Sequence, residues 1–196
     1  MDDDAACGLC YTSGTTGNPK GVLYSHKSNI LHAQASLNAM PIGPDETILM
    51  VVPLFHVLAW GIPYYGPMNG SKLVMPGMQM EGEPLYDLID KEEVTLAFGV
   101  PTIWMGLLTY CRDNNKILTS VRNTIIGGSA LSLPTLQEFD EVHDVNVIHA
   151  WGMTEMSPLG TINVPTPEME NMGKEEKYAI QLKQGKPIYG VELKVV

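Results

Sequence analysis

A dense polar segment lies near the start of the chain, at residues 11–22. It contains four serine or threonine hydroxyls, three glycines and a lysine, in the order Tyr-Thr-Ser-Gly-Thr-Thr-Gly-Asn-Pro-Lys-Gly-Val. Glycine lets main-chain N–H groups approach an anion, hydroxyls donate hydrogen bonds, and a lysine supplies a point charge. The segment therefore predicts a polyphosphate site. It is not a Walker A sequence, because Lys20 follows Pro19 and precedes Gly21.

Two further loops carry residues suited to nucleotide chemistry, and both follow apolar runs. Residues 127–131 are Gly-Gly-Ser-Ala-Leu, and residues 151–155 are Trp-Gly-Met-Thr-Glu. An aromatic ring offers a stacking surface for a base, and small residues let a flat ring approach the backbone. His56 and Trp60 lie in a third, largely apolar segment, where such residues are more often structural than functional when taken alone.

Short apolar runs alternate with segments of helical character along the chain. The pattern predicts strands at residues 7–12, 47–52, 71–75, 94–100, 123–126 and 145–149. It predicts helices at residues 25–40, with Ser25 as the N-cap, and at 84–92, 101–112 and 134–142. This alternation indicates an α/β fold, a mostly parallel sheet with helices on both faces. Because ligands gather at the carboxyl ends of parallel strands, we expect the loops at 12–21, 127–131 and 151–154 to form one site.

The composition excludes several classes of protein. The chain of 196 residues is 44% hydrophobic, enough to bury a core, and its net charge of −10 argues against nucleic acid or an anionic membrane as a partner. Three cysteines, among them the Cys7-x-x-Cys10 pair, indicate a reducing compartment and ordinary strand thiols. Without a run of 18 apolar residues or a signal peptide, a cytoplasmic location is expected. Residues 165–184, rich in Glu, Met, Asn and Lys, are expected to form a surface loop excursion.

Five ordered motifs resemble the adenylate-forming (AMP-binding) superfamily, which includes acyl-CoA synthetases. The polar segment is similar to its phosphate-binding signature, and the others are Pro53-Leu-Phe-His56, Gly127-Gly-Ser-Ala-Leu131, Trp151-Gly-Met-Thr-Glu155 and the expected strand Gly185-Lys-Pro-Ile-Tyr-Gly-Val-Glu192. The resemblance implies that residues 1–196 are a partial AMP-binding domain, the central part of the large N-terminal domain of such a synthetase. Family members also have an N-terminal subdomain, a mobile C-terminal domain, a ribose-binding aspartate and a catalytic lysine, which match no position here.

The resemblance implies a two-step reaction, the ATP-dependent ligation of a fatty acid to CoA. A carboxylate attacks the α-phosphate of Mg·ATP, which releases pyrophosphate and leaves an acyl-adenylate, and the thiol of CoA then takes the acyl group. Trp60 and His149 make the chain similar to the medium- and long-chain fatty acyl-CoA synthetases. The expected partners are a fatty acid, ATP and CoA, with Mg²⁺ as cofactor. A homodimer of the full-length parent is left open.

The resemblance also assigns a role to individual residues. The β- and γ-phosphates are expected against Thr12, Ser13, Gly14, Thr15, Thr16, Gly17 and Lys20. Adenine and AMP are expected against Gly128, Ser129, Ala130, His149, Ala150, Trp151, Gly152 and Thr154. The acyl group is expected against His56, Val57, Trp60 and Gly61, with His56 and Trp60 on one helical face. The expected ligands of Mg²⁺, which prefers few carboxylates plus phosphate oxygens and water, are Glu155 and Thr12. The expected catalytic residues are Lys20, His56, Thr154 and Glu155.

Two alternatives stay open on the sequence. A truncated paralogue would be a non-catalytic module that binds ATP or an acyl-adenylate. An aryl- or amino-acid-activating relative would differ in the acyl pocket and not in the ATP loops.

Overall fold

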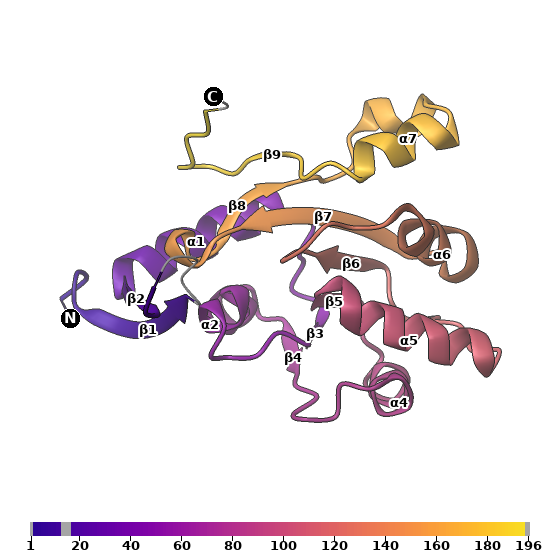
Figure 1. The fold of residues 1–196 in the computed structure, drawn as a ribbon, viewed down its shortest axis with the longest axis horizontal. Helices are drawn as coiled ribbons and strands as arrows, with labels where there is room; N and C mark the ends of the chain where they lie inside the picture. The colour runs from indigo at the N-terminus through magenta and orange to yellow at the C-terminus, as the bar shows by residue number, and fades with distance from the viewer. Residues whose placement is uncertain (1, 13–16, 195–196) are drawn as a thin grey trace.

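The computed structural model describes residues 2–12 and 17–194 and contains two β-sheets (Figure 1). The smaller sheet is a hairpin of two antiparallel strands, β1 (Ala6–Thr12) and β2 (Lys20–Ser25). The larger sheet has seven strands in the order β4-β3-β5-β6-β7-β8-β9. Their bounds are β3 (Thr47–Met50), β4 (Lys72–Val74), β5 (Leu96–Gly99), β6 (Asn123–Ile126), β7 (Asn146–Gly152), β8 (Leu159–Ile162) and β9 (Lys186–Pro187).

The first five strands of the large sheet run parallel to their neighbours, whereas β8 and β9 pair antiparallel. These parallel strands are buried on both faces. In β3, for example, Leu49 belongs to one hydrophobic core and Ile48 to the core on the other face. Strands that are buried on both faces have continuous apolar sequences, which is why these strands show no alternation of apolar and polar residues. The mostly parallel α/β sheet predicted from the sequence is confirmed.

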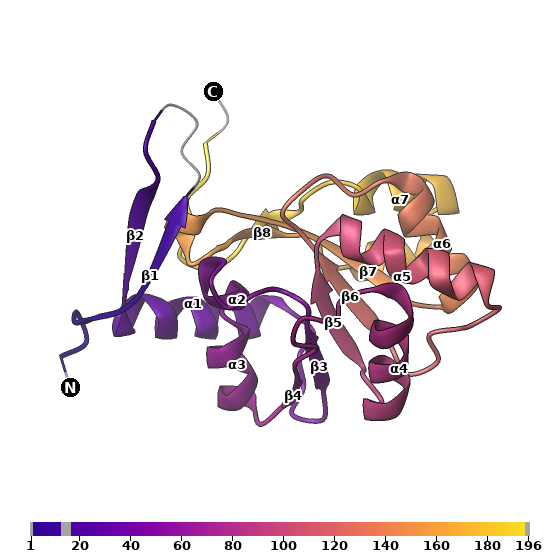
Figure 2. The same cartoon turned by 60° about the horizontal axis from the view of Figure 1, so that its bottom comes forward.

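Helices cover both faces of the large sheet, as Figure 2 shows. One face packs against α4 (Gly82–Glu92), α5 (Pro101–Asp113), α6 (Leu133–His143) and α7 (Lys174–Gln181). The other face packs against α1 (His26–Ala39), α2 (Val57–Trp60) and α3 (Ile62–Asn69). None of the helices in the described part of the chain has the length and apolar character needed to cross a bilayer.

The helix ends follow the predicted local chemistry. Ser25 caps α1 in a reciprocal capping box with Ser28, in which each side-chain oxygen accepts the other residue's main-chain N–H at 3.1 Å. Pro101 stands in the first turn of α5, where no N–H is needed. Both predictions are confirmed.

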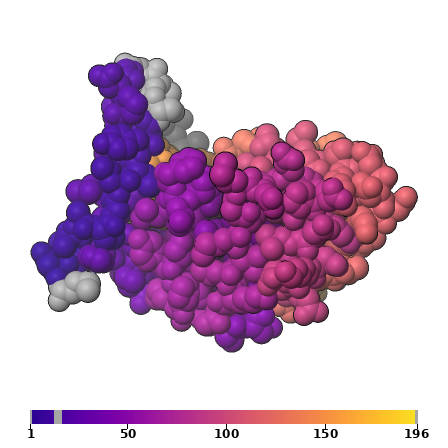
Figure 3. Space-filling view, turned by 90° about the horizontal axis from the view of Figure 1, so that it is seen from below, coloured from indigo at the N-terminus to yellow at the C-terminus, as the bar shows by residue number. Residues whose placement is uncertain are grey.

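The phosphate-loop segment differs from its prediction. It was expected to follow a strand of the parallel sheet, but it connects β1 and β2, which form a separate ribbon. Figure 3 shows this hairpin projecting from the body of the molecule. The reason is that residues 20–25 pair with residues 6–12 next to them along the chain, so the ribbon closes locally and needs no crossover helix.

The segment at residues 165–184 is not the loop that its composition suggests. It contains a 3-10 turn, η2 (Pro167–Asn171), and then α7, which buries Tyr178 and Gln181. These two residues lie three positions apart on one helical face, and the charged residues cover the other face. The segment therefore forms a short amphipathic helix although its composition is mostly polar. The strand expected at residues 185–192 is reduced to the two residues of β9.

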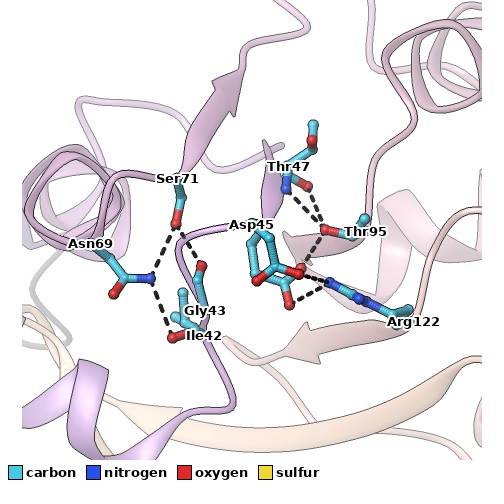
Figure 4. Close-up of polar contacts among 9 residues, drawn as sticks. Ile42, Gly43, Asp45, Thr47, Asn69, Ser71, Thr95 and Arg122 are labelled. Atoms are coloured by element: carbon cyan, nitrogen blue, oxygen red, sulfur yellow. Dashed lines mark hydrogen bonds and ion pairs between the residues drawn. The ribbon is translucent and has the colours of Figure 1, made fainter.

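Paired polar groups lie at the amino ends of the parallel strands, as Figure 4 shows. The buried Glu46 carboxylate accepts a hydrogen bond from the Arg122 guanidinium at 2.9 Å and a second from the Thr95 hydroxyl. Asp45 lies 3.6 Å from the same guanidinium. Because Glu46, Thr95 and Arg122 immediately precede β3, β5 and β6, this network joins three adjacent strands at one edge.

Candidate nucleotide and acyl site

A cavity of about 230 Å³ lies on the α1 and α3 side of the large sheet, toward the carboxyl ends of β5, β6 and β7. It brings together three segments that are far apart in sequence, residues 56–60, 127–128 and 150–154. The remaining lining residues are Ser36, Met40, Tyr65, Phe98, Ile125, Pro158 and Leu159. The loops after β6 and at the end of β7 therefore meet at the carboxyl edge, as predicted.

The segment between His56 and Gly61 departs from the predicted helical face. Residues 57–60 all have positive φ, between 49° and 58°, so they form a left-handed turn. L-residues seldom adopt this conformation because Cβ then crowds the following carbonyl oxygen. Within this turn the side chains of Val57 and Ala59 are buried. The residue that follows the turn, Gly61, also has a positive φ, of 79°. His56 and Trp60 both line the cavity, but they do so from a left-handed turn and share no right-handed helical face.

Trp60 packs against the glycine pair that follows β6. A Cβ added at Gly127 would lie 3.4 Å from the Trp60 ring, and one at Gly128 would lie 3.8 Å from it. Gly128 also has a φ of 80°, which favours glycine on conformational grounds. The indole ring therefore occupies space that is open because Gly127 and Gly128 have no side chains. Trp60, predicted to contact the acyl group, thus packs against Gly128, predicted to contact adenine.

Trp151 and Gly152 lie within β7, although the prediction placed them in a loop after it. Antiparallel pairing with β8, through Trp151 and Thr161, extends the strand to Gly152. The Trp151 ring covers Gly160 of β8, where a Cβ would come within 2.6 Å of the ring. The motif of residues 151–155 thus begins on strand β7, and only its last two residues, Thr154 and Glu155, lie in the following 3-10 turn, η1 (Thr154–Met156).

Three of the predicted adenine-binding residues lie outside the cavity lining. Ser129 and Ala130 are exposed on the turn after β6. His149 is 2% exposed, and its Nδ1–H donates to the Leu182 carbonyl at 2.9 Å beside α7. Successive strand side chains point to opposite faces, so Ala150 faces the cavity and His149 faces away. The His149 side chain thus points away from the cavity, and a role for His149 in binding adenine stays a prediction.

Gly61 also lies outside the cavity lining. It ends the left-handed turn, and a Cβ there would lie 2.9 Å from the His32 ring. Its positive φ and its approach to His32 give it a conformational and packing role, and its assignment to the acyl wall stays a prediction. The His32 imidazole that packs there is buried, which lowers its pKa to about 4, and its Nε2 accepts the Leu159 N–H at 3.1 Å.

The inner end of the cavity was not predicted. It is formed mainly by apolar side chains, Met40, Tyr65, Phe98 and Ile125, with the Tyr65 and Phe98 ring centroids 6.0 Å apart. Phe98 and Ile125 lie next to the last residues of β5 and β6, so the rule that sites form at the carboxyl ends of parallel strands could have indicated them. Tyr65 carries no such signal, because its place depends on how α3 packs.

The phosphate hairpin presents two of its predicted residues directly opposite each other. Thr12 pairs with Lys20 across the ribbon, and the Thr12 hydroxyl donates to the Lys20 carbonyl at 3.5 Å. Gly17 and Lys20 are exposed. Ser13, Gly14, Thr15 and Thr16 lie outside the described residues. Strand β1 also contacts η1, which brings the hairpin beside Thr154 and Glu155.

The residues present fit an Mg²⁺ ion that takes most of its ligands from phosphate and water. Glu155 is exposed at the turn beside the hairpin, and among residues 2–12 and 17–194 no three His, Cys, Asp or Glu side chains gather as a protein-built metal site. A single carboxylate, aided by a hydroxyl such as that of Thr12, suits Mg²⁺, which rarely uses an all-protein cage. The same donor set would be poor for zinc.

The AMP-binding enzyme family matches the chain over residues 1–196. The protein belongs to this family. The medium-chain-fatty-acid–CoA ligase of Ectopseudomonas oleovorans is 48% identical over 200 residues, a match that covers 100% of this chain and 36% of the relative. The 3-methylmercaptopropionyl-CoA ligase of Ruegeria lacuscaerulensis is 49% identical over 198 residues, with 100% and 37% covered.

A solved structure supports the fold. The N-terminal domain of FACL13 from Mycobacterium tuberculosis superposes with a TM-score of 0.81 at 23% identity, covering 95% of this chain and 44% of that chain. The described region is therefore α/β architecture of the kind found in that N-terminal domain. The chain spans a little over a third of the length of the curated relatives that it matches.

Proposed function

We propose that the protein activates a fatty acid, as an AMP-forming ligase that joins the acid to CoA at the expense of ATP. The observation that carries this proposal is the single cavity in which Trp60 and an apolar inner end lie next to Trp151 and Thr154. An apolar compartment suits an acyl chain, while the polar mouth formed by strand ends suits the nucleotide. Close similarity to acyl-CoA ligases supports the same reaction.

The proposed first step forms a bond between a carboxylate oxygen of the acid and the α-phosphorus of ATP, and pyrophosphate leaves. Lys20 and the hairpin hold the β- and γ-phosphates, so that positive charge and N–H donors stabilise the leaving group. Thr154 binds the α-phosphate and Trp151 stacks on adenine. Mg²⁺, held by Glu155 and Thr12, neutralises phosphate charge when it is bound.

In the proposed second step, the CoA sulfur attacks the acyl carbon and AMP leaves. His56 borders the carboxylate end of the cavity and, being exposed, can approach it from the loop. Trp60 and Val57 orient the acyl chain.

Three free cysteines support a reducing compartment, and we therefore place the protein in the cytoplasm. A homodimer stays a prediction.

A pyrophosphate-exchange assay on the full-length protein tests this function. The panel contains saturated fatty acids from C4 to C16, benzoate derivatives and amino acids, each with Mg·ATP. Exchange that depends on a fatty acid, followed by CoA thioester formation, is the expected result. Exchange with benzoates or amino acids and not with fatty acids would assign the protein to a different acid class. Mg·ATP binding without any exchange would identify a non-catalytic module.

A further inference from the structure

Tyr24 connects two parts of the site that are 130 residues apart in sequence. It lies on β2 of the phosphate hairpin, is 3% exposed, and donates its hydroxyl hydrogen to the main-chain carbonyl of Thr154 at 2.6 Å. Within the described part of the chain, this is the only hydrogen bond between the hairpin and residues 150–158. Tyr24 thus supplies the hydrogen bond that joins the turn η1 to the hairpin, in addition to the contact between β1 and η1.

The surroundings of Tyr24 hold its ring in place. Tyr24 forms a small buried cluster with Cys10 of β1 and Val57 of the left-handed turn, and Trp60 packs against the same cluster. One side chain therefore touches three of the four segments that carry candidate site residues: the hairpin, the loop of Val57 and, through its hydroxyl, the Thr154 turn.

The Tyr24 hydroxyl is suited to act as a permanent donor. Burial, and then the nearby Cys10 thiol and Glu155 carboxylate, raise the pKa of Tyr24 well above its ordinary value. The hydroxyl consequently keeps its proton at every physiological pH. Because the Tyr24 hydroxyl is buried, leaving it without an acceptor would be costly, which favours its bond to the Thr154 carbonyl.

We propose that Tyr24 is a positioning residue for Mg·ATP, which holds Thr154 and Glu155 in register with the phosphate hairpin. The proposal rests on the proposed function of those two segments. In it, the hairpin binds the β- and γ-phosphates, the turn binds the α-phosphate and the metal, and Tyr24 fixes the distance between them. Misplacing such groups by a fraction of an ångström weakens binding even though no contact to the nucleotide is removed.

The test compares Tyr24→Phe with Tyr86→Phe in the full-length protein. Both substitutions remove a tyrosine hydroxyl that donates to a main-chain carbonyl, but Tyr86 lies on α4 and bonds to Ile117, away from the cavity. Calorimetry measures the Kd for Mg·ATP alone, and pyrophosphate exchange measures KM for ATP and for the acid. We expect Tyr24→Phe to raise the Kd and the KM for Mg·ATP about tenfold, with the KM for the acid unchanged. We expect Tyr86→Phe to change neither.

Hydrogen exchange separates positioning from general destabilisation. Faster exchange in Tyr24→Phe is expected at residues 153–157, with the large sheet unchanged. Faster exchange throughout the protein, an unchanged Mg·ATP affinity, or an equal loss in Tyr86→Phe would overturn the proposal. If the wild-type protein binds Mg·ATP but supports no exchange with fatty acids, the proposed function fails, while the Mg·ATP affinities of the two variants still decide the role of Tyr24.

Discussion

The two ends of the parallel strands differ in how their polar groups are satisfied. At the amino ends, Glu46, Thr95 and Arg122 bond to one another, and Asn69 and Ser71 pair nearby with the main chain of residues 42–43 (Figure 4). At the carboxyl ends, glycines replace side chains and a cavity remains between Trp60 and Trp151.

This difference shows where the molecule gains stability and where it can bind. At the amino edge the buried Glu46 carboxylate already accepts hydrogen bonds from Arg122 and Thr95, which indicates a structural role for this network. The carboxyl end combines an unfilled cavity with a left-handed turn, features that cost stability and that persist where a site uses them. The following substitutions separate the two ends, from the largest expected effect to the smallest.

Glu155→Gln is expected to have the largest effect, and on activity alone. The substitution removes an exposed carboxylate from the turn beside the hairpin, so the fold is retained while metal-assisted charge stabilisation is lost. We expect kcat/KM for Mg·ATP to fall by about a hundredfold or more. Glu92→Gln, which removes a carboxylate paired with Lys72 at 2.9 Å, is the control. Identical Mg²⁺ titrations for Glu155→Gln and the wild-type protein would rule out the metal role.

The pH dependence of the free energy of unfolding tests His32, which packs near the cavity at the carboxyl ends of the strands. Its folded-state pKa of about 4 lies below the ordinary value of 6.5 because the ring is buried. Between those values the unfolded chain binds more protons, so the free energy of unfolding falls as the pH falls. The contribution is fully present above pH 6.5, and roughly 3 kcal/mol is lost by pH 4.

Urea unfolding between pH 7 and pH 4 measures this dependence. His32→Gln is expected to reduce the slope of unfolding free energy against pH, whereas His26→Gln, at the first residue of α1, is expected to keep it. A slope unaffected by His32→Gln would show that other groups cause the dependence.

Arg122→Met tests the amino end. Glu46 is 6% exposed and would lose its charged partner, but the Arg122 side chain is 52% exposed, so solvent screens part of the interaction. We expect the free energy of unfolding to fall by about 1–2 kcal/mol, with the affinity for Mg·ATP unchanged. Arg112→Met breaks the Glu138 pair between α5 and α6 and should cost less than about 1 kcal/mol. Equal losses in the two variants would remove the distinction between the strand-end network and an ordinary surface pair.

Trp60→Ala is expected to change acyl preference and little else. Removing the indole enlarges the cavity beside Gly127, which should shift kcat/KM toward longer acids by about tenfold. The KM for Mg·ATP should stay the same, because the adenine side is formed by other residues. Tyr110→Ala, a half-buried aromatic on α5, is the control. An unchanged acyl profile would assign Trp60 to core packing.

Much of the large sheet was predictable from the chain, because its strands and helices depend on local patterns. Residues 123–126 form a strand with the predicted bounds, and Ser25 and Pro101 begin helices as expected. The hairpin and α7 were missed because neither depends on a clear apolar period. The left-handed turn at residues 57–60 was missed because no L-residue favours positive φ by itself.

The amino-acid sequence by itself determined the family, the α/β class and the loops that carry the motifs, since these follow from residue type, residue order and the local pattern of apolar residues. Only the tertiary structure decided that His149 faces α7, that Trp60 meets the glycine pair, and that Tyr24 reaches Thr154. Which face a strand residue takes, and which distant groups meet, depend on the packing of both sheet faces at once. Neither feature can be read from a local sequence pattern.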